Sequence, residues 1–275
     1  MDLQQFLFLA AAVVFGLACR SFNNRYLMKL GWLSYLLATY LVGYFLTGSH
    51  VAGAFGITLW FMLPWLEIVT YVRHLRFPLR NAMKHRFAPN AEIFPELGYL
   101  SDEMEQAGFE AVGDTGFEWA RSEQFMRLFV HQELRTQAAI VQVRQEMLDL
   151  AFSYISLTSR CQDGRIFTTA NFPLAPVLRF APRHEVNRYL QADSLEELTQ
   201  AHETFLAKNG VTVNELALLD EEQLVSAIEQ EMVEQIEHNI RTGLLEPANE
   251  EGKIRYSWRG CFYLWFQGVM DMLRV

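Results

Sequence analysis

The chain has 275 residues, of which 51% are hydrophobic and 20% are charged, and its mean hydropathy is +0.05. Soluble domains carry roughly 25% charged residues, so this composition is unusually apolar. The net charge of −9 argues against general nucleic-acid binding, which needs cations to neutralise phosphates, and we predict no nucleic-acid partner. The three cysteines are far apart and odd in number, which excludes a disulfide framework and a CxxC metal motif.

Charge is distributed unequally along the chain. Residues 1–88 hold eight basic and two acidic residues, for a net charge of +6. Residues 89–275 hold 15 basic and 30 acidic residues, for a net charge of −15. This asymmetry predicts two physically different regions in one chain.

Three apolar blocks predict a transmembrane region over residues 1–72, and therefore a lipid bilayer as a partner. The blocks cover about residues 3–19, 30–47 and 51–72. As helices they would measure ~26, ~27 and ~33 Å, close to the ~30 Å hydrocarbon core of a bilayer. Buried soluble helices are the alternative. For the first block a cleaved signal peptide is a further alternative, although residues 1–5 lack Lys and Arg.

The loops between these blocks predict the topology. Three basic residues, Arg20, Arg25 and Lys29, follow the first block, and residues 48–50 between the other two contain neither Lys nor Arg. Five more follow the third block, namely Arg73, Arg76, Arg80, Lys84 and Arg86. Because Lys and Arg favour the cytoplasmic side, we expect the N-terminus outside and residues 73–275 inside. The short loops and the lack of targeting signals favour the bacterial inner membrane.

A few residues within the blocks have expected structural roles. Pro64 should kink the third block because it lacks a helical donor. The spacings Ala12-x-x-x-Gly16 and Gly53-x-x-Gly56 would allow helices to approach closely. Glu67 is expected at the cytosolic interface near Arg73 and Arg76, and a role in an ion route is the alternative.

Residues 73–95 form a basic junction with three prolines, and residues 96–192 are predicted to form an α+β domain. A short helix is expected over 101–107, and strands over 109–112, 125–131, 138–145, 151–160 and 165–171. Asp163-Gly164 is typical of a two-residue type I′ hairpin, which would pair Ser159 with Thr168. Short links favour an antiparallel meander. Prolines in 172–184 favour an irregular segment.

Residues 193–275 are predicted to be helical. Capping boxes are expected to begin helical segments at Ser194, Thr212 and Asp220. The final helix has an apolar face built from Trp258, Phe262, Trp265, Val269 and Met272. It would pack in the core, on a partner or on the membrane surface. The predicted fold class is therefore α+β: an N-terminal three-helix transmembrane anchor followed by a cytosolic antiparallel β-meander with C-terminal helices.

An acidic run covers residues 209–240, which contain eight acidic residues and neither Lys nor Arg. The usual explanation is a solvated helix face, here carrying Glu229, Glu231, Glu234 and Glu237. The alternative is that the run docks on a basic surface. That surface would belong to a partner protein or to the chain's own segment 73–86, through Arg76, Arg80 and Lys84.

Motifs for common chemistries are absent: the sequence has no GxGxxG, Walker, GxSxG or HExxH motif. We therefore predict no catalytic residue, cofactor or metal. His184-Glu185 and His202-Glu203 are the alternative as metal ligands, and Cys161 is interpreted as structural. If a ligand site exists, we expect it where five residues gather at one end of the sheet: Arg160, Asp163, Arg165, Thr168 and Asn171.

The function that best fits these features is an integral membrane accessory, assembly or scaffolding subunit without catalytic activity. Its partners would be other membrane-protein subunits or a second copy of itself. Candidate partner or membrane-surface contacts are Arg76, Arg80, Lys84, Trp258, Phe262 and Trp265. The alternatives are a membrane-tethered small-ligand sensor and a membrane-tethered hydrolase without a recognisable motif.

Overall fold

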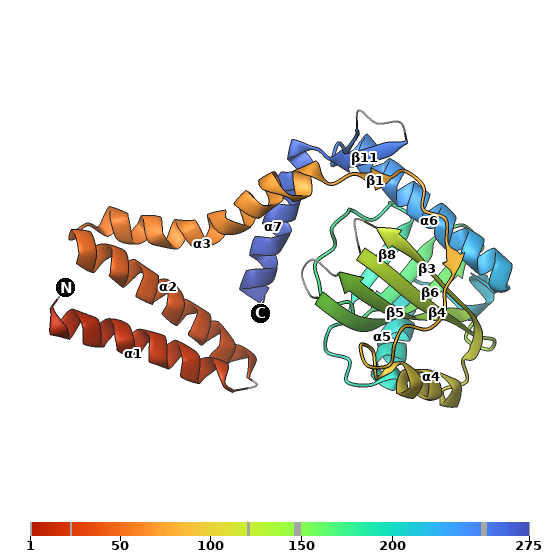
Figure 1. Cartoon of the computed structure of the whole chain (residues 1–275). Helices are drawn as coiled ribbons and strands as arrows, with labels where there is room; N and C mark the ends of the chain where they lie inside the picture. The colour runs from red at the N-terminus through yellow and green to blue at the C-terminus, as the bar shows by residue number, and fades with distance from the viewer. Residues whose placement is uncertain (1, 23, 120–121, 146–149, 249–251, 275) are drawn as a thin grey trace. The chain divides into compact units, whose positions relative to one another are not determined.

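The computed structural model describes residues 2–22, 24–119, 122–145, 150–248 and 252–274 (Figure 1). The chain divides into two compact units. The first, here called the helical unit, comprises Met1–His74 and Tyr256–Val275. The second, here called the sheet unit, comprises Leu75–Arg255. The fold is therefore α+β, with apolar helices at the N-terminus and a mostly antiparallel sheet with further helices after it.

The helical unit contains the three predicted apolar helices. They are α1 (Leu3–Arg20), α2 (Arg25–Thr47) and α3 (His50–Thr70), and the 3₁₀ turn η1 (Val72–His74) follows them. All three are long and apolar enough to cross a membrane. Asn24 caps α2 by accepting hydrogen bonds from the Tyr26 and Leu27 N–H groups, and Gly48 ends it with φ at +71°.

Small residues allow these helices to pack closely. A methyl group on Gly16 would lie 3.2 Å from the Tyr35 ring, and one on Gly53 would lie 2.7 Å from the Tyr40 ring. The Ser34 hydroxyl donates to the Ala12 carbonyl at 2.6 Å, which also joins α1 to α2. The small-residue faces expected at Gly16 and Gly53 thus serve contacts within the chain.

The C-terminal helix α7 (Trp258–Arg274) belongs to the helical unit and packs on α3. The Trp265 indole N–H donates to the Phe61 carbonyl at 2.6 Å. The rings of Phe262 and Trp265 each lie edge-on to Trp65, with centroids 6.3 Å apart. The helix thus contacts the third apolar helix of its own chain, a setting that was not among the three expected for it. The side chain of Met272 lies outside the described part of the structure.

The sheet unit is built on one large sheet with the order β2-β3-β4-β5-β6-β7-β8, and β9 pairs with the end of β6. Its strands are β2 (Lys84–His85), β3 (Glu110–Trp119), β4 (Ser122–His131), β5 (Thr136–Gln145), β6 (Leu150–Cys161), β7 (Ile166–Ala170), β8 (His184–Arg188) and β9 (Leu216–Ala217). The meander from β3 to β7 is antiparallel, as predicted.

β8 departs from the predicted meander because it joins the sheet parallel to β7. It begins at His184, within the segment expected to be irregular. The sequence of β8 is His-Glu-Val-Asn-Arg, which has one apolar residue and therefore lacks the alternation that indicates a strand. Backbone hydrogen bonds to β7 therefore form this strand, although its side-chain pattern does not predict one.

The β6–β7 turn also differs from the prediction. Ser159 pairs with Phe167, not with Thr168, and the Cys161 N–H donates to the Arg165 carbonyl at 2.8 Å. The loop therefore has three residues, because only Gly164, with φ at +90°, adopts the left-handed region, whereas a type I′ turn needs two such residues. A shift of one residue in register moves each side chain of a strand to the opposite face of the sheet. Here the shift places Thr168 opposite Thr158.

Helices cover both faces of the large sheet. Two of them, α4 (Leu97–Gln106) and α5 (Leu195–Lys208), share one core with the sheet, and its most deeply buried members are Met104, Phe129, Ile140, Leu157 and Leu198. The third, α6 (Glu221–Arg241), packs on the opposite face, where Leu224 lies with Leu128 and Val141. Alternation along β4 and β5 supplies both cores, since successive side chains point to opposite faces.

Two of the three predicted helix starts are confirmed as α-helical. The Ser194 hydroxyl accepts from the Glu197 N–H at 3.2 Å, and the Asp220 carboxylate accepts from the Gln223 N–H at 2.9 Å. The capping box from Thr212 instead opens only the short 3₁₀ turn η3 (Val213–Glu215). The helix expected over 101–107 begins earlier, at Leu97.

A second, three-stranded sheet joins the two segments by which the chain enters and leaves the sheet unit. It consists of β1 (Phe77–Pro78), β11 (Lys253–Tyr256) and β10 (Leu245–Pro247), in that order. Phe77 pairs with Ile254, both are buried, and the Phe77 ring stacks on Trp119 with centroids 5.0 Å apart. The proline-containing junction therefore includes a strand that is packed into the sheet unit.

Candidate functional site

The five residues proposed as a ligand site do not gather at one end of the sheet. Asp163 and Arg165 bind each other at the β6–β7 turn, with the Arg165 Nε 2.7 Å from a carboxylate oxygen. Asn171 follows the other end of β7, and its side-chain oxygen accepts from the Ile155 N–H at 2.7 Å. Only Arg160 and Thr168 lie in a common polar network, which faces α6.

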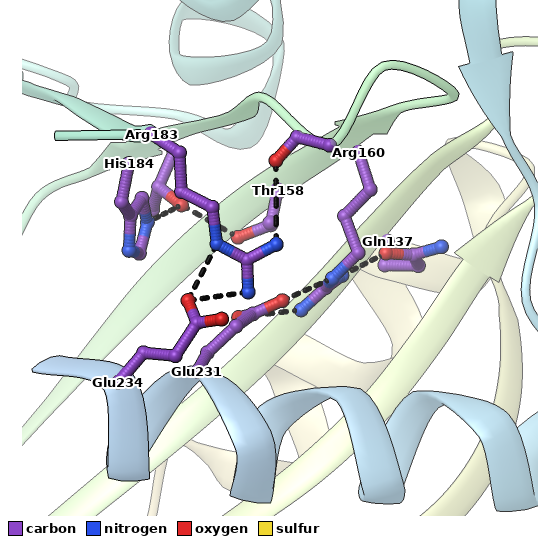
Figure 2. A network of polar contacts seen from close by, with 9 residues as sticks. Gln137, Thr158, Arg160, Arg183, His184, Glu231 and Glu234 are labelled. Carbon is purple, nitrogen blue, oxygen red and sulfur yellow. Dashed lines mark hydrogen bonds and ion pairs between the residues drawn. The ribbon is translucent and has the colours of Figure 1, made fainter. Parts of the chain in front are cut away.

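The centre of this network is an ion pair between the sheet and α6 (Figure 2). The Arg160 guanidinium donates through Nε and Nη2 to the two carboxylate oxygens of Glu231, at 2.6 and 3.0 Å. It donates further to the side-chain oxygen of Gln137 on β5. The Arg160 and Glu231 side chains are only 10% and 14% exposed. This bidentate geometry is the strongest form of an Arg–carboxylate contact, and with the contact to Gln137 it occupies all three nitrogens of the guanidinium.

A second ion pair lies beside the first but is more open to solvent. Arg183, in the segment before β8, contacts Glu234 of α6 through Nε and Nη2, each at 2.5 Å (Figure 2). The two side chains are 37% and 34% exposed. Arg183 also donates to the Gly164 carbonyl at 3.4 Å, which ties it to the β6–β7 turn. The pair therefore joins α6, β8 and this turn.

Threonines and a histidine complete the network on the side of β7 and β8. The Thr168 hydroxyl lies 3.0 Å from the Thr158 hydroxyl and 2.9 Å from Nε2 of His184. Burial lowers the pKa of His184 most strongly, and Arg160 and Arg183 lower it further, whereas Glu231 raises it. The imidazole is thus favoured in its neutral form, able to share one hydrogen bond with Thr168.

The prediction of a solvated acidic face on α6 is wrong for Glu231, which is largely enclosed, whereas Glu229 and Glu234 are paired but partly exposed and Glu237 is exposed. Glu231 and Glu234 turn towards the sheet and pair with Arg160 and Arg183, and the Glu229 carboxylate accepts from the Met83 N–H at 2.5 Å. Helix geometry explains this, because Glu231 lies seven residues after Leu224 and on the same face. Counting this spacing would have indicated from the sequence that Glu231 faces the sheet, although not which residue it contacts. The alternative of docking within the chain is nearer to what is found, although the arginines are Arg160 of β6 and Arg183 before β8, and segment 73–86 contributes the Met83 N–H.

A second polar network is buried on the opposite face of the sheet, under α5. His202 contacts the Ser159 hydroxyl through Nε2 and the Thr169 hydroxyl through Nδ1, both at 3.0 Å. Ser159 also contacts the Thr136 hydroxyl at 3.0 Å. Burial lowers the pKa of His202 to about 4. All four side chains are buried, so a Ser–His pair that resembles a nucleophile and its base here has a structural role, that of satisfying polar groups in the core.

Two further possibilities concerned a metal site built from His and Glu and a reactive cysteine at Cys161. Among the described residues, no group of three or more His, Cys, Asp or Glu side chains could hold a metal ion. The Cys161 thiol is buried, and burial together with Asp163 raises its pKa. A nucleophilic cysteine needs the opposite shift.

The candidate contact residues fall into two groups. Arg76, Arg80 and Lys84 lie in the junction, where Arg80 and Lys84 are exposed and Arg76 donates to the Leu75 carbonyl at 3.1 Å. The three aromatic candidates all lie on α7: Trp258, Phe262 and Trp265. The guanidinium of Arg73 lies over the Trp258 ring, 5.4 Å from its centroid.

Comparison with known proteins adds no relative. No protein-family model matches the chain, and no match is found among curated proteins or among solved structures. The interpretation of both polar networks therefore rests on their geometry. The first network attaches α6 to the sheet through ion pairs, and the second satisfies the buried polar groups around His202.

Proposed function

We propose that the chain is an integral protein of the bacterial inner membrane with three spans. Support comes from three helices that are long and apolar enough to cross a membrane, and from the basic residues that flank them. The N-terminus would be outside and the sheet unit in the cytoplasm. A reporter enzyme that is active only outside the cytoplasm should be active when fused after residue 49 and inactive when fused after residue 90. The reverse result would contradict this topology.

Within this membrane setting, we propose that the protein is a non-catalytic accessory, assembly or scaffolding subunit of a membrane complex. The observation that carries the proposal is that each of the five candidate polar side chains is bound to another group of the same chain. Side chains engaged in this way stabilise the folded unit and position its surface for a partner. A ligand would have to break these contacts in order to bind the same groups.

A small-ligand sensor remains a second candidate because of one specific observation. The side-chain nitrogen of Gln137 is buried without a hydrogen-bond partner, next to the Arg160–Glu231 pair. A buried unsatisfied amide is costly, so it is a natural contact for a polar ligand. A ligand that bound here would be polar.

Native purification distinguishes the two candidates. The tagged chain would be expressed at its natural level, extracted in mild detergent and analysed by native mass spectrometry. For an assembly subunit we expect other membrane proteins in fixed stoichiometry that survive dilution and are absent from an untagged control. A mass equal to the 31.8 kDa chain alone would contradict the assembly role, and that mass plus a small polar molecule would favour the sensor.

A further inference from the structure

We propose that α7 is a fourth membrane-embedded helix, inserted into the cytosolic leaflet beside α3, with an aromatic stripe that begins at the headgroup level and continues among the lipid acyl chains. The stripe consists of Trp258, Phe262 and Phe266. This inference rests on the proposed membrane placement of α1–α3 and extends it to a helix that composition alone does not identify as a span. The partner of the stripe is therefore the bilayer.

The first argument is the way in which α7 is attached to α3. Pro64 lies inside α3 and cannot donate a hydrogen bond to the carbonyl one turn earlier, and its ring crowds that turn. The next carbonyl, that of Phe61, accepts the Trp265 indole N–H at 2.6 Å. In a hydrocarbon medium no water can accept from an indole N–H, and this carbonyl supplies the acceptor.

The second argument is the depth of this contact. Phe61 precedes the end of α3 at Thr70 by nine residues, which is ~14 Å along a helix at ~1.5 Å per residue. Arg73 lies over the Trp258 ring at the start of α7, a combination typical of the headgroup level. Because half of a bilayer core is ~15 Å thick, a Trp265 that contacts Phe61 lies among acyl chains when α3 crosses the membrane.

The third argument is the exposed face of α7. Trp258, Phe262 and Phe266 follow one another at intervals of four residues and are 59%, 56% and 48% exposed. Cys261, on another face of the helix, is completely buried. Three large aromatic side chains along one helix face are unfavourable in water, and Leu63 and Leu66 of α3 are exposed in the same way. Lipid would cover both helices at once.

The charges of the sequence set how far α7 reaches. Arg259 and Asp271 bracket eleven uncharged residues, 260–270, which would span ~16 Å as a helix. This is about half of the ~30 Å hydrocarbon core, so the run matches one leaflet and does not cross the bilayer. Arg259 then lies at the headgroup end of the run, and the charges at its other end, Asp271 and Arg274, limit how deeply the helix inserts, because charged side chains are costly at the bilayer centre.

Spin-label accessibility tests this placement on the full chain. The purified protein would be reconstituted, without other proteins, into vesicles of phosphatidylcholine and phosphatidylglycerol. Single nitroxides would be attached to Phe266→Cys, to Leu66→Cys in α3 and to Thr204→Cys, which is exposed on α5 in the sheet unit. The three native cysteines are buried, and the wild-type chain serves as the labelling control. Collision rates would be measured with oxygen, which concentrates in lipid, and with a water-soluble nickel chelate.

We expect the oxygen-to-nickel collision ratio at 266 to equal that at 66 and to exceed that at 204 several-fold. A ratio at 266 equal to that at 204, with 66 still lipid-like, would overturn the insertion of α7 and leave the membrane placement of α3 intact. Exclusion of both reagents at 266 would mean that a second copy covers the stripe, which would also overturn it. A water-like ratio at 66 would refute the membrane setting itself. Phe262→Cys provides a second position on the same stripe, and the same result is expected there.

Discussion

Replacing Arg160 by alanine is expected to destabilise the sheet unit by about 3–5 kcal/mol, because it leaves the Glu231 carboxylate buried without its partner. The Arg160 and Glu231 side chains are 10% and 14% exposed, so little water can replace the lost bonds. Gln137 would lose its donor as well. The measurement is urea-induced unfolding of the full chain in mild detergent, followed by the circular dichroism of the sheet.

The matched control is Arg183→Ala, which removes the arginine partner of another glutamate, Glu234, on the same helix, where both arginine nitrogens contact a single carboxylate oxygen. The Arg183 and Glu234 side chains are 37% and 34% exposed, so we expect a loss of only about 0–1 kcal/mol. The double replacement Arg160→Met with Glu231→Leu should recover most of the loss, since no charge is left unpaired. Equal losses for Arg160→Ala and Arg183→Ala would contradict the view that burial makes the first pair the essential clamp.

Acidification is expected to destabilise the protein through His202. Its pKa is about 4 in the folded state, whereas an unfolded histidine titrates near ~6.5. Between these values the unfolded chain binds a proton that the folded chain does not, so stability is full above about pH 6.5 and falls as the pH decreases towards about 4. A difference of this size corresponds to roughly 3 kcal/mol. The free energy of unfolding, measured across this pH range, gives the slope directly.

The variant His202→Gln should remove most of this slope. A smaller slope should persist from His184, because its pKa is also lowered by burial. His85→Gln, at an exposed position on β2, is the matched control and should keep the wild-type profile. If His202→Gln and the wild type lost stability in parallel down to pH ~4, the proposed coupling between the buried imidazole and folding would be wrong.

Elements with strong local patterns could be predicted from the sequence. The three apolar helices, the antiparallel strands from β4 to β7 and the helix starts at Ser194 and Asp220 were all expected from runs, alternation and caps. Strands with weak local patterns were either missed or predicted too short. β8 was missed because its side chains are mostly polar, and β3, expected over 109–112, extends to Trp119. The backbone of β3 pairs with β4 from Glu110 to Trp119, with a bulge at Val112, and this pairing depends on the neighbouring strand.

The candidate site was predictable only in part. Arg160 and Thr168 were named, but the spacing of residues could not bring Glu231, Glu234 and Arg183 to them, since these lie on α6 and before β8. The one-residue shift at Gly164 mattered most, because it turned Thr168 to the face that carries Arg160. Turn geometry of this kind depends on the φ angles of Asp163 and Gly164, and an Asp-Gly pair is compatible with more than one loop length.

The unequal charge and the apolar blocks determined from the sequence alone that an apolar helical part precedes an acidic α+β part. These properties are local, since the length of an apolar run and the charge of a segment do not depend on which distant residues the segment contacts. Tertiary structure decided which acidic residues meet which arginines, that His202 is enclosed in a core, and that α7 packs on α3. Each of these is a contact between residues far apart in sequence, where the energy depends on burial and register that no local pattern contains.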